Sequence, residues 1–266
     1  MNYKKIYLPY IDTSSFTPYY VGSRPRMATA TGVRIIKNTI LVAHLLGRKL
    51  YLIDFKGDIL LQINTEFETD MFDYNDNRIV CTNLFDKRVS LFNLDESGIH
   101  FVDYIPVPYE HIHGVRFHED KIFVTPRNNV VSINSDGISS IVYTSSDQVQ
   151  DIIFIDDLAL VVTTKGTVGI SPINIPVKAT TLYLYRNEHL LDQISLDGQA
   201  DALCYCKKGY ITLQDMNSIA EFSIIDSKIV FHRYIPGFDF PHGIDCTKDM
   251  IAVTNYGDNS ITILTE

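Results

Sequence analysis

The feature that most constrains this chain is an internal repeat of about 40 residues. The last copy, FPHGIDCTKDMIAVTNYGDNSITILTE, consists of three short apolar strands separated by tight connections. Five earlier copies follow the same frame, in which an anchor residue precedes two apolar strands joined by a polar turn. The spacings between successive anchors are 39, 43, 37, 51 and 41 residues, and the anchors are Gly32, Met71, Gly114, Asp151, Ala202 and Gly243. A period of about 40 to 45 residues with four strands per unit is typical of a β-propeller blade.

A fourth strand can be recognised in most copies. Residues 49–63 and 181–194 read as hairpins, and turns that contain Gly occur at 96–98 and 136–137. The last copy has only three strands, so residues 4–8 are expected to supply its outer strand and to remove the open edges. No apolar pattern of period 3.6 runs long enough for a helix. The sequence therefore predicts an all-β protein: a single six-bladed β-propeller domain over residues 1–266, closed by an N-terminal strand.

Composition narrows the classes of partner. The net charge is −9 and no basic cluster is longer than two residues, which argues against a nucleic-acid partner because phosphates need a positive surface. The N-terminus lacks the apolar run of a secretion signal, and no segment approaches the roughly 20 apolar residues of a membrane helix. The four cysteines show no disulfide framework and no zinc-site spacing. We therefore expect a cytoplasmic protein with reduced, mostly buried thiols and no membrane partner.

Polar residues recur at two positions of the blade frame that are expected to meet at one mouth of the central channel. The ends of the second strands carry His44, Asn83, Arg127, Asp215, Asn255 and Tyr256. The starts of the inner strands carry Thr31, Asp70, His113, Gln150, Asp201 and His242. The two longest loops, residues 11–30 and 165–180, belong to the same face, and loops of that length are usually functional or disordered. Tyr20 and Arg24 in the first loop either line this mouth or form part of a surface strap.

Two histidines stand out within this set. Tyr-Ile-Pro precedes both His113-Gly114 and His242-Gly243, and about three blades separate the two, so they are expected to face each other across the channel. A histidine can act as acid or base near neutral pH, and Arg24 or Arg127 can hold a carboxylate or phosphate. The alternative for each histidine is a purely structural hydrogen bond to the backbone of the next blade.

The segment PHGIDCTKDMIAVTNYGDNSITI resembles the repeat of NHL-type and lactonase-like six-bladed β-propellers, in which Pro-His-Gly opens the inner strand and Val-Thr-Asn closes the second. This resemblance covers the whole chain as architecture. It implies a fold that serves hydrolases, lyases and binding modules alike.

The resemblance also implies two kinds of cation site in the central channel. A related lyase, peptidyl-α-hydroxyglycine lyase, binds zinc through three histidines from alternate blades. This chain has only two, on opposite blades, and would need a third ligand such as Asp201 or His44. The calcium-dependent lactonases use Glu, Asn and Asp ligands, to which Asn83, Asn255, Asp201, Asp151 and Asp70 correspond in chemical type. Their early Glu-x-Pro segment is missing here. A cofactor is therefore not certain, and a divalent Ca or Zn ion is one option.

The sequence favours a propeller that binds a small anionic molecule at the loop-rich end of the channel. The expected chemistry is that of a hydrolase, lyase or cyclase, with His113 and His242 as catalytic residues. The expected substrate-binding residues are His44, Asn83, Arg127, Asp151, Asp201, Asn255, Tyr256, Tyr20 and Arg24. The alternative is a non-catalytic protein-interaction scaffold that uses the same face or the blade rims. The oligomeric state is left open.

Overall fold

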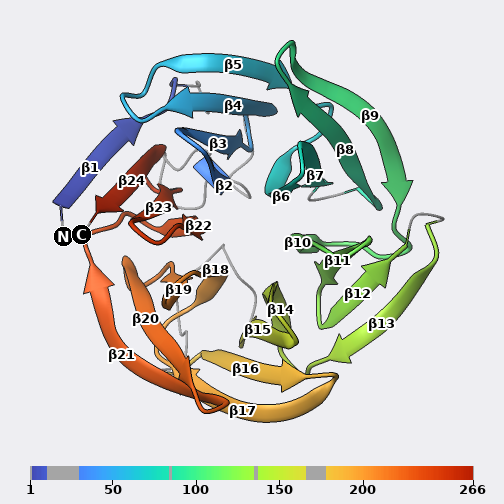
Figure 1. Cartoon of the computed structure of the whole chain (residues 1–266), viewed down its shortest axis with the longest axis vertical. Coiled ribbons are helices and arrows are strands. Elements are labelled where there is room, and N and C mark those ends of the chain that lie inside the picture. Colours follow the sequence, from blue (N-terminus) through green and yellow to red (C-terminus); the bar gives the residue numbers. More distant parts are fainter. Residues whose placement is uncertain (1, 11–29, 84–85, 135–136, 166–177, 266) are drawn as a thin grey trace.

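A computed structural model describes the chain except for residues 1, 11–29, 84–85, 135–136, 166–177 and 266. Six four-stranded sheets are arranged as a ring around a central axis, with the inner strands β2, β6, β10, β14, β18 and β22 closest to it (Figure 1). All neighbouring strands within the sheets are antiparallel. The described residues include no helix. The predicted six-bladed β-propeller is therefore confirmed.

The first three blades follow each other along the chain from the innermost to the outermost strand. Blade one contains β2 (Ala30–Ile36), β3 (Thr39–His44), β4 (Lys49–Asp54) and β5 (Ile59–Asn64). Blade two contains β6 (Thr69–Asn75), β7 (Arg78–Asn83), β8 (Arg88–Asp95) and β9 (Gly98–Pro106). Blade three contains β10 (Ile112–His118), β11 (Lys121–Pro126), β12 (Asn129–Ile133) and β13 (Ser139–Thr144).

The last three blades repeat this order, except that the outer strand of blade six comes from the N-terminus. Blade four contains β14 (Gln148–Ile155), β15 (Leu158–Thr164), β16 (Thr180–Arg186) and β17 (His189–Leu196). Blade five contains β18 (Ala200–Tyr205), β19 (Gly209–Leu213), β20 (Ser218–Ile225) and β21 (Lys228–Pro236). Blade six contains β22 (Pro241–Cys246), β23 (Met250–Asn255), β24 (Ser260–Thr265) and β1 (Asn2–Tyr7).

The closure of the ring is the predicted one. Strand β1 pairs with β24 from Asn2↔Thr265 to Tyr7↔Ser260, so it begins two residues and ends one residue before the predicted strand over residues 4–8. Ile6 is the buried member of this strand, and it packs in an apolar cluster that also contains residues of blade one. Each of the other apolar clusters likewise fills the space between neighbouring blades, because the two faces of each sheet pack against its neighbours.

The His-Gly dipeptide has a structural reason. The amides of Gly114 and Gly243 each donate to a threonine hydroxyl, Thr125 Oγ1 and Thr254 Oγ1, at 2.7 Å. A Cβ on Gly114 would lie 2.8 Å from the carbonyl oxygen of Gln150 in the next blade, and one on Gly243 would overlap the carbonyl oxygen of Thr31. Glycine is therefore the residue that lets consecutive blades approach closely at this point.

Among the described residues, no helix is long and apolar enough to cross a membrane.

Candidate functional site

Each inner strand has a β-bulge close to its start, and one polar residue lies in each bulge. The register between the first and second strands of every blade shifts at this point. A bulge re-aims the side chain it contains, and a polar residue occupies this position in all six blades. None of these six residues is more than 7% exposed. We call them the polar ring, and they are Thr31, Asp70, His113, Gln150, Asp201 and His242.

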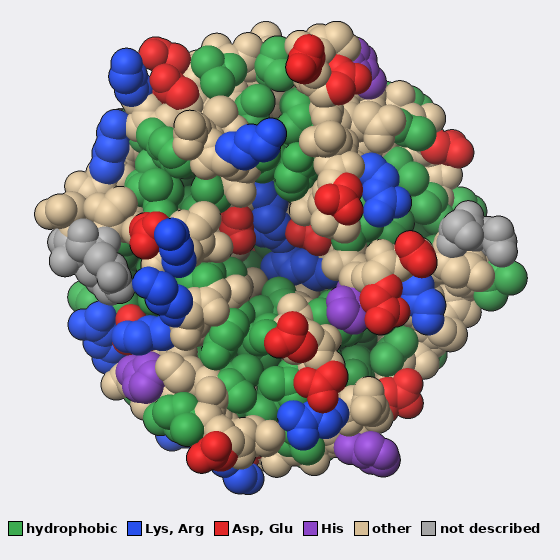
Figure 2. All heavy atoms as spheres, in the orientation of Figure 1, with side chains coloured by type: hydrophobic (Ala, Val, Ile, Leu, Met, Phe, Trp, Pro, Cys, Tyr) green, Lys and Arg blue, Asp and Glu red, His purple; other side chains and the backbone are tan. Residues whose placement is uncertain are grey.

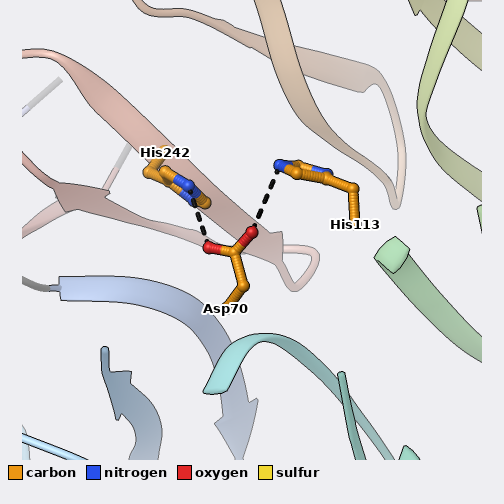
Figure 3. Close-up of side chains that lie close together, drawn as sticks. All are labelled: Asp70, His113 and His242. Atoms are coloured by element: carbon orange, nitrogen blue, oxygen red, sulfur yellow. Dashed lines mark ion pairs between the residues drawn. The ribbon is translucent and has the colours of Figure 1, made fainter. Parts of the chain in front are cut away.

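Four members of the polar ring are in direct contact. Nε2 of His113 lies 3.2 Å from Oδ1 of Asp201 and 3.6 Å from Oδ2 of Asp70. Nε2 of His242 lies 3.3 Å from Oδ1 of Asp70, and its Nδ1 lies 2.8 Å from Oδ2 of Asp201. The two imidazole rings are 5.7 Å apart and inclined by 30°, so the predicted approach of the two histidines is present. Figure 3 shows Asp70 placed between them.

A backbone contact sets the proton position on His113. Its Nδ1 lies 2.8 Å from the carbonyl oxygen of Gln150, and a carbonyl can only accept, so Nδ1 carries a proton. Nε2 is then the nitrogen that faces the two carboxylates. It either carries a second proton or presents its lone pair to a cation, and a backbone partner of this kind is the usual support of a metal-binding histidine.

Several polar atoms of the ring have no hydrogen-bond partner. Both carboxylate oxygens of Asp201 and Nδ1 of His242 are buried without one, because the 2.8 Å contact between them is not aligned as a hydrogen bond. The amide nitrogen and oxygen of Gln150 also lack a partner. A buried polar group without a partner costs about 1–3 kcal/mol, so these atoms form a place where a ligand would be stabilised.

The charges within the cluster shift its pKa values strongly. Burial alone would lower the pKa of each histidine, but the carboxylates of Asp201 and Asp70 outweigh it. The pKa is raised to about 9 for His113 and to about 10 for His242. Burial would raise the pKa of Asp201, yet the two histidines lower it below its usual value. At neutral pH both imidazoles are therefore protonated when no other cation is present.

A second polar layer lies further along the inner strands. Arg34 pairs with Asp73 at 2.8 Å, and Arg116 pairs with Asp151. The carboxylates of this layer also accept backbone amides of the following blade, such as Asp245 from Ile35 at 2.7 Å. Figure 2 shows basic side chains with acidic ones beside them at the hollowed centre of the ring. These contacts fasten consecutive blades together around the axis.

The two layers together carry an excess of negative charge. Their described carboxylates are five, Asp70, Asp73, Asp151, Asp201 and Asp245, against two guanidinium groups, Arg34 and Arg116. With both histidines neutral the excess is three negative charges, and with both protonated it is one. Burial, partly offset by Arg34, raises the pKa of Asp151 to about 7, so the charges are counted here with Asp151 ionised.

The residues predicted at the ends of the second strands differ in the contacts that they make. Tyr256 stacks on His242, with the ring centroids 5.6 Å apart. The side-chain amides of Asn83 and Asn255 donate to the hydroxyls of Ser90 in β8 and Ser260 in β24, the strand that follows in each blade. These two amides are therefore occupied within their own blades.

The other predicted binding residues are scattered. His44 is fully buried, packs edge-on against Tyr51, and has a pKa lowered to about 4, mainly by burial. Arg127 is exposed, and Asp151 belongs to the second layer with Arg116. Tyr20 and Arg24 fall outside the described residues. The binding roles of these residues stay predictions.

As a possible ligand, Asp70 was named from the sequence only among those of calcium type that the resemblance implies. It was expected in the polar ring, but not as a partner of the histidines. The available signal was its place in the repeat, since it precedes the anchor Met71 as His113 precedes Gly114. The possible ligand atoms of Asp70, His113 and His242 lie within 4.8 Å of one another. Asp70 therefore offers the third ligand that a cation shared by the two histidines would need.

Comparison with known proteins defines the fold. No family model matches the chain, and no curated protein matches it by sequence. Among solved structures, virginiamycin B lyase from Staphylococcus aureus is 12% identical with a TM-score of 0.64, over 100% of this chain and 99% of that one. A streptogramin B lyase is 13% identical with a TM-score of 0.64, over 98% and 96%.

A likeness of the same extent is found with a protein of another kind. U3-55K is 9% identical with a TM-score of 0.64, over 90% of this chain and 96% of that one. At such identities the likeness extends to the fold alone. The chain is thus a six-bladed β-propeller of the architecture that the resemblance to NHL-type and lactonase-like propellers predicted.

Proposed function

We propose that this protein is an enzyme that acts on a small anionic molecule at a divalent-cation centre on the propeller axis. Asp70, His113 and His242 would hold the cation, with Asp201 beside them. The observation that carries the proposal is the convergence of two imidazoles and two carboxylates from four different blades at one buried point. A structural role in joining neighbouring blades would not require residues of opposite blades to meet.

The donor set fits such a cation. Imidazole nitrogens together with carboxylate oxygens suit first-row divalent ions such as Zn²⁺ or Mn²⁺ better than Ca²⁺, which prefers oxygen ligands only. The oxygens of Asp201 form ion pairs with His113 and His242, and an ion that displaces the histidine protons would replace these contacts. A divalent cation with two neutral histidines also leaves the same net charge in the channel as two protonated histidines do. The exchange of two protons for one ion is therefore electrostatically balanced.

The pKa values favour this centre over a pair of free histidine bases. With pKa values of about 9 and 10, both imidazoles are protonated at pH 7 and neither can accept a proton from a substrate. An ion that displaces those protons removes this obstacle. In this proposal the catalytic contribution of His113 and His242 is to bind the ion, which replaces the acid/base role expected from the sequence.

The surrounding residues would orient the ion's ligands and the substrate. The carbonyl oxygen of Gln150 holds the ring of His113, and Tyr256 packs on the ring of His242. The unpaired amide of Gln150 offers a donor and an acceptor to a bound molecule. A bound cation supplies Lewis-acid activation of a carbonyl or phosphoryl oxygen. The names of the similar virginiamycin B and streptogramin B lyases support a lyase reaction among the hydrolase, lyase and cyclase options.

The test is direct measurement of metal binding by the purified protein. We expect one equivalent of Zn²⁺ or Mn²⁺ in calorimetric titration after chelator treatment. His242→Ala should weaken binding by more than about 100-fold, because the loss of a ligand exceeds the 10- to 100-fold cost of losing a supporting partner. The matched control is His189→Ala, at an exposed histidine on the rim. Equal affinity in both variants and the parent protein would exclude the proposed centre.

The scaffold alternative has an observation of its own. The outer strands expose apolar side chains, among them Phe101 at 47% and Leu190 at 51%. These residues lie on the blade rims, where a protein partner would bind. A partner that binds equally well to the parent protein and to His242→Ala, combined with no metal binding, would favour the scaffold.

A further inference from the structure

The space between blades three and four, which follow each other in the ring (Figure 1), is closed differently from the other spaces between blades. On the face of blade four that packs against blade three, β16 presents Tyr183 and Tyr185. Their neighbours on β15, Val161 and Ala159, are buried, whereas both tyrosines are partly exposed. The two blades therefore leave these aromatic side chains partly uncovered.

The repeat shows that this exposure is particular to blade four. In each of the other blades, the third-strand residue that corresponds to Tyr185 is apolar and pairs with the equivalent residue of the second strand. These counterparts are Ile53, Phe92, Ile133, Phe222 and Leu264. None of these five described residues is more than 3% exposed. The blade frame therefore does not account for a partly exposed tyrosine at this position.

A depression of about 160 Å³ lies next to the two tyrosines. Blade three contributes Tyr143 of β13 and residues 144–146 to its wall. Blade four contributes Thr163 in addition to Tyr183 and Tyr185. A cavity of about 150 Å³ can hold one benzene-sized molecule. The depression therefore has room for a single six-membered ring.

The three tyrosine rings of the depression form a stack. The centroids of Tyr143 and Tyr185 are 4.5 Å apart with the rings inclined by 36°, and those of Tyr185 and Tyr183 are 6.1 Å apart with the rings inclined by 28°. Tyr185 is thus the middle ring. The phenol hydroxyls of the three tyrosines form no hydrogen bond with another described residue. They can therefore donate to a ligand and accept from it.

The lining of the depression is polar but uncharged. Ser146 adds a further hydroxyl to those of the tyrosines, and none of the described residues that line the depression is acidic, basic or a histidine. An ion would lose its hydration here without gaining an opposite charge, so a neutral ligand is favoured. A pyranose ring matches this lining, because its C–H groups can pack on an aromatic face while its hydroxyls donate and accept at the edge.

We propose that the depression between blades three and four binds one neutral pyranose unit of a carbohydrate. The stacked tyrosine rings would contact the apolar face of the sugar, and the hydroxyls of Tyr143, Tyr183 and Ser146 would bond to its hydroxyls. A planar aromatic molecule, or an apolar segment of a protein, would leave most of these hydroxyls unpaired. The inference is independent of the proposed cation centre, because the two sites share no residue.

The experiment is an NMR titration of the full chain with a panel of neutral methyl glycosides in the pyranose form, comprising hexoses, deoxyhexoses and N-acetylhexosamines. We expect at least one of them to bind with a dissociation constant in the millimolar range, as is usual for one small ring. It should shift the amide signals of residues 143–146, Tyr183 and Tyr185. Tyr185→Ala should weaken binding by more than about 10-fold, since it removes the middle ring.

A milder variant and two controls make the test independent of the folding of Tyr185→Ala. Tyr143→Phe keeps the ring and removes one hydroxyl, so it should weaken binding by about 3- to 10-fold and leave the thermal unfolding unchanged. Tyr205→Phe alters a partly exposed tyrosine between blades four and five, and it should bind the glycoside as the parent protein does. His242→Ala should also bind it equally well, which separates this site from the cation centre.

Three results would overturn the proposal. They are no binding of any glycoside at millimolar concentrations, signal shifts confined to other parts of the protein, and equal affinity in the parent protein and both tyrosine variants of the stack. Preferential binding of a planar aromatic probe such as phenol, or dimerisation of the protein through this surface, would overturn it as well.

Discussion

The histidine pair makes the stability of the metal-free protein depend on pH in a defined direction. The pKa of each imidazole is raised in the folded state, to about 9 for His113 and about 10 for His242, above the usual 6.5. A group of this kind contributes stability that is complete below pH 6.5 and is lost as the pH rises through its folded-state pKa. The free energy of unfolding should therefore fall between pH 6.5 and about 10.

The slope follows from proton linkage. Between the two pKa values the folded state holds one more proton per histidine than the unfolded state, so stability falls by about 1.4 kcal/mol per pH unit for each. For two histidines we expect a loss of about 2.7 kcal/mol between pH 7.5 and 8.5. This value requires only that both pKa values stay above the window. Below the window Asp151 titrates, with a pKa of about 7. Thiols of the unfolded chain, whose pKa is about 8.5, begin to ionise inside the window and add a slope of the same sign to the parent protein and to any variant.

The assay is urea unfolding followed by circular dichroism, with a chelator present, at several pH values from 7.5 to 8.5. The control is Asp201→Asn, which removes a carboxylate that contacts both histidines, at 3.2 and 2.8 Å. In this variant the pKa values of His113 and His242 should return toward 6.5, and the free energy of unfolding should fall less steeply with pH than that of the parent protein. A flat profile in the parent protein, or the same slope in both proteins, would refute the charge arrangement derived for the cluster.

Three further predictions concern the axis and the ring closure. The affinity for Zn²⁺ should rise by up to about 100-fold per pH unit between pH 7 and 8.5, because binding displaces two protons; calorimetry in buffers of different ionisation enthalpy would count them. Gly243→Ala should lower the free energy of unfolding by about 3 kcal/mol, measured by chemical unfolding, because the new methyl group overlaps the carbonyl oxygen of Thr31. In the control Gly137→Ala the new methyl group meets no atom within 4 Å, and the loss should be about 1 kcal/mol. Deletion of residues 1–7 should lower the melting temperature and produce aggregates in size-exclusion chromatography, because β24 becomes an open edge; an unchanged monomer would contradict the role of β1.

The repeat made the architecture predictable, and its frame carried most of the site with it. The blades share the same local devices: a bulged strand start, a tight turn and, in all blades except blade one, a threonine near the end of the second strand, where blade one has Ala43. Because these devices recur in register, the position of His113 in one blade predicted the position of His242 in another. The polar ring was predicted for the same reason, including Gln150 and Thr31.

The partners of the histidines were not predictable in the same way. The repeat places Asp70 and Asp201 in the ring, but it does not say which side chains reach the axis closely enough to touch. That depends on the radius of the ring and on side-chain length. Asn83 and Asn255 occupy equivalent positions at the mouth, yet their amides turn back to serines of their own blades.

The sequence by itself determined the number of blades, the closure by the N-terminal strand and the six polar positions at the strand starts. All of these depend on local pattern and period, which a linear chain carries in full. Only the tertiary structure decided that two aspartates each contact both histidines. This cluster forms between strands far apart in sequence, so it exists only when ring closure brings these strands together.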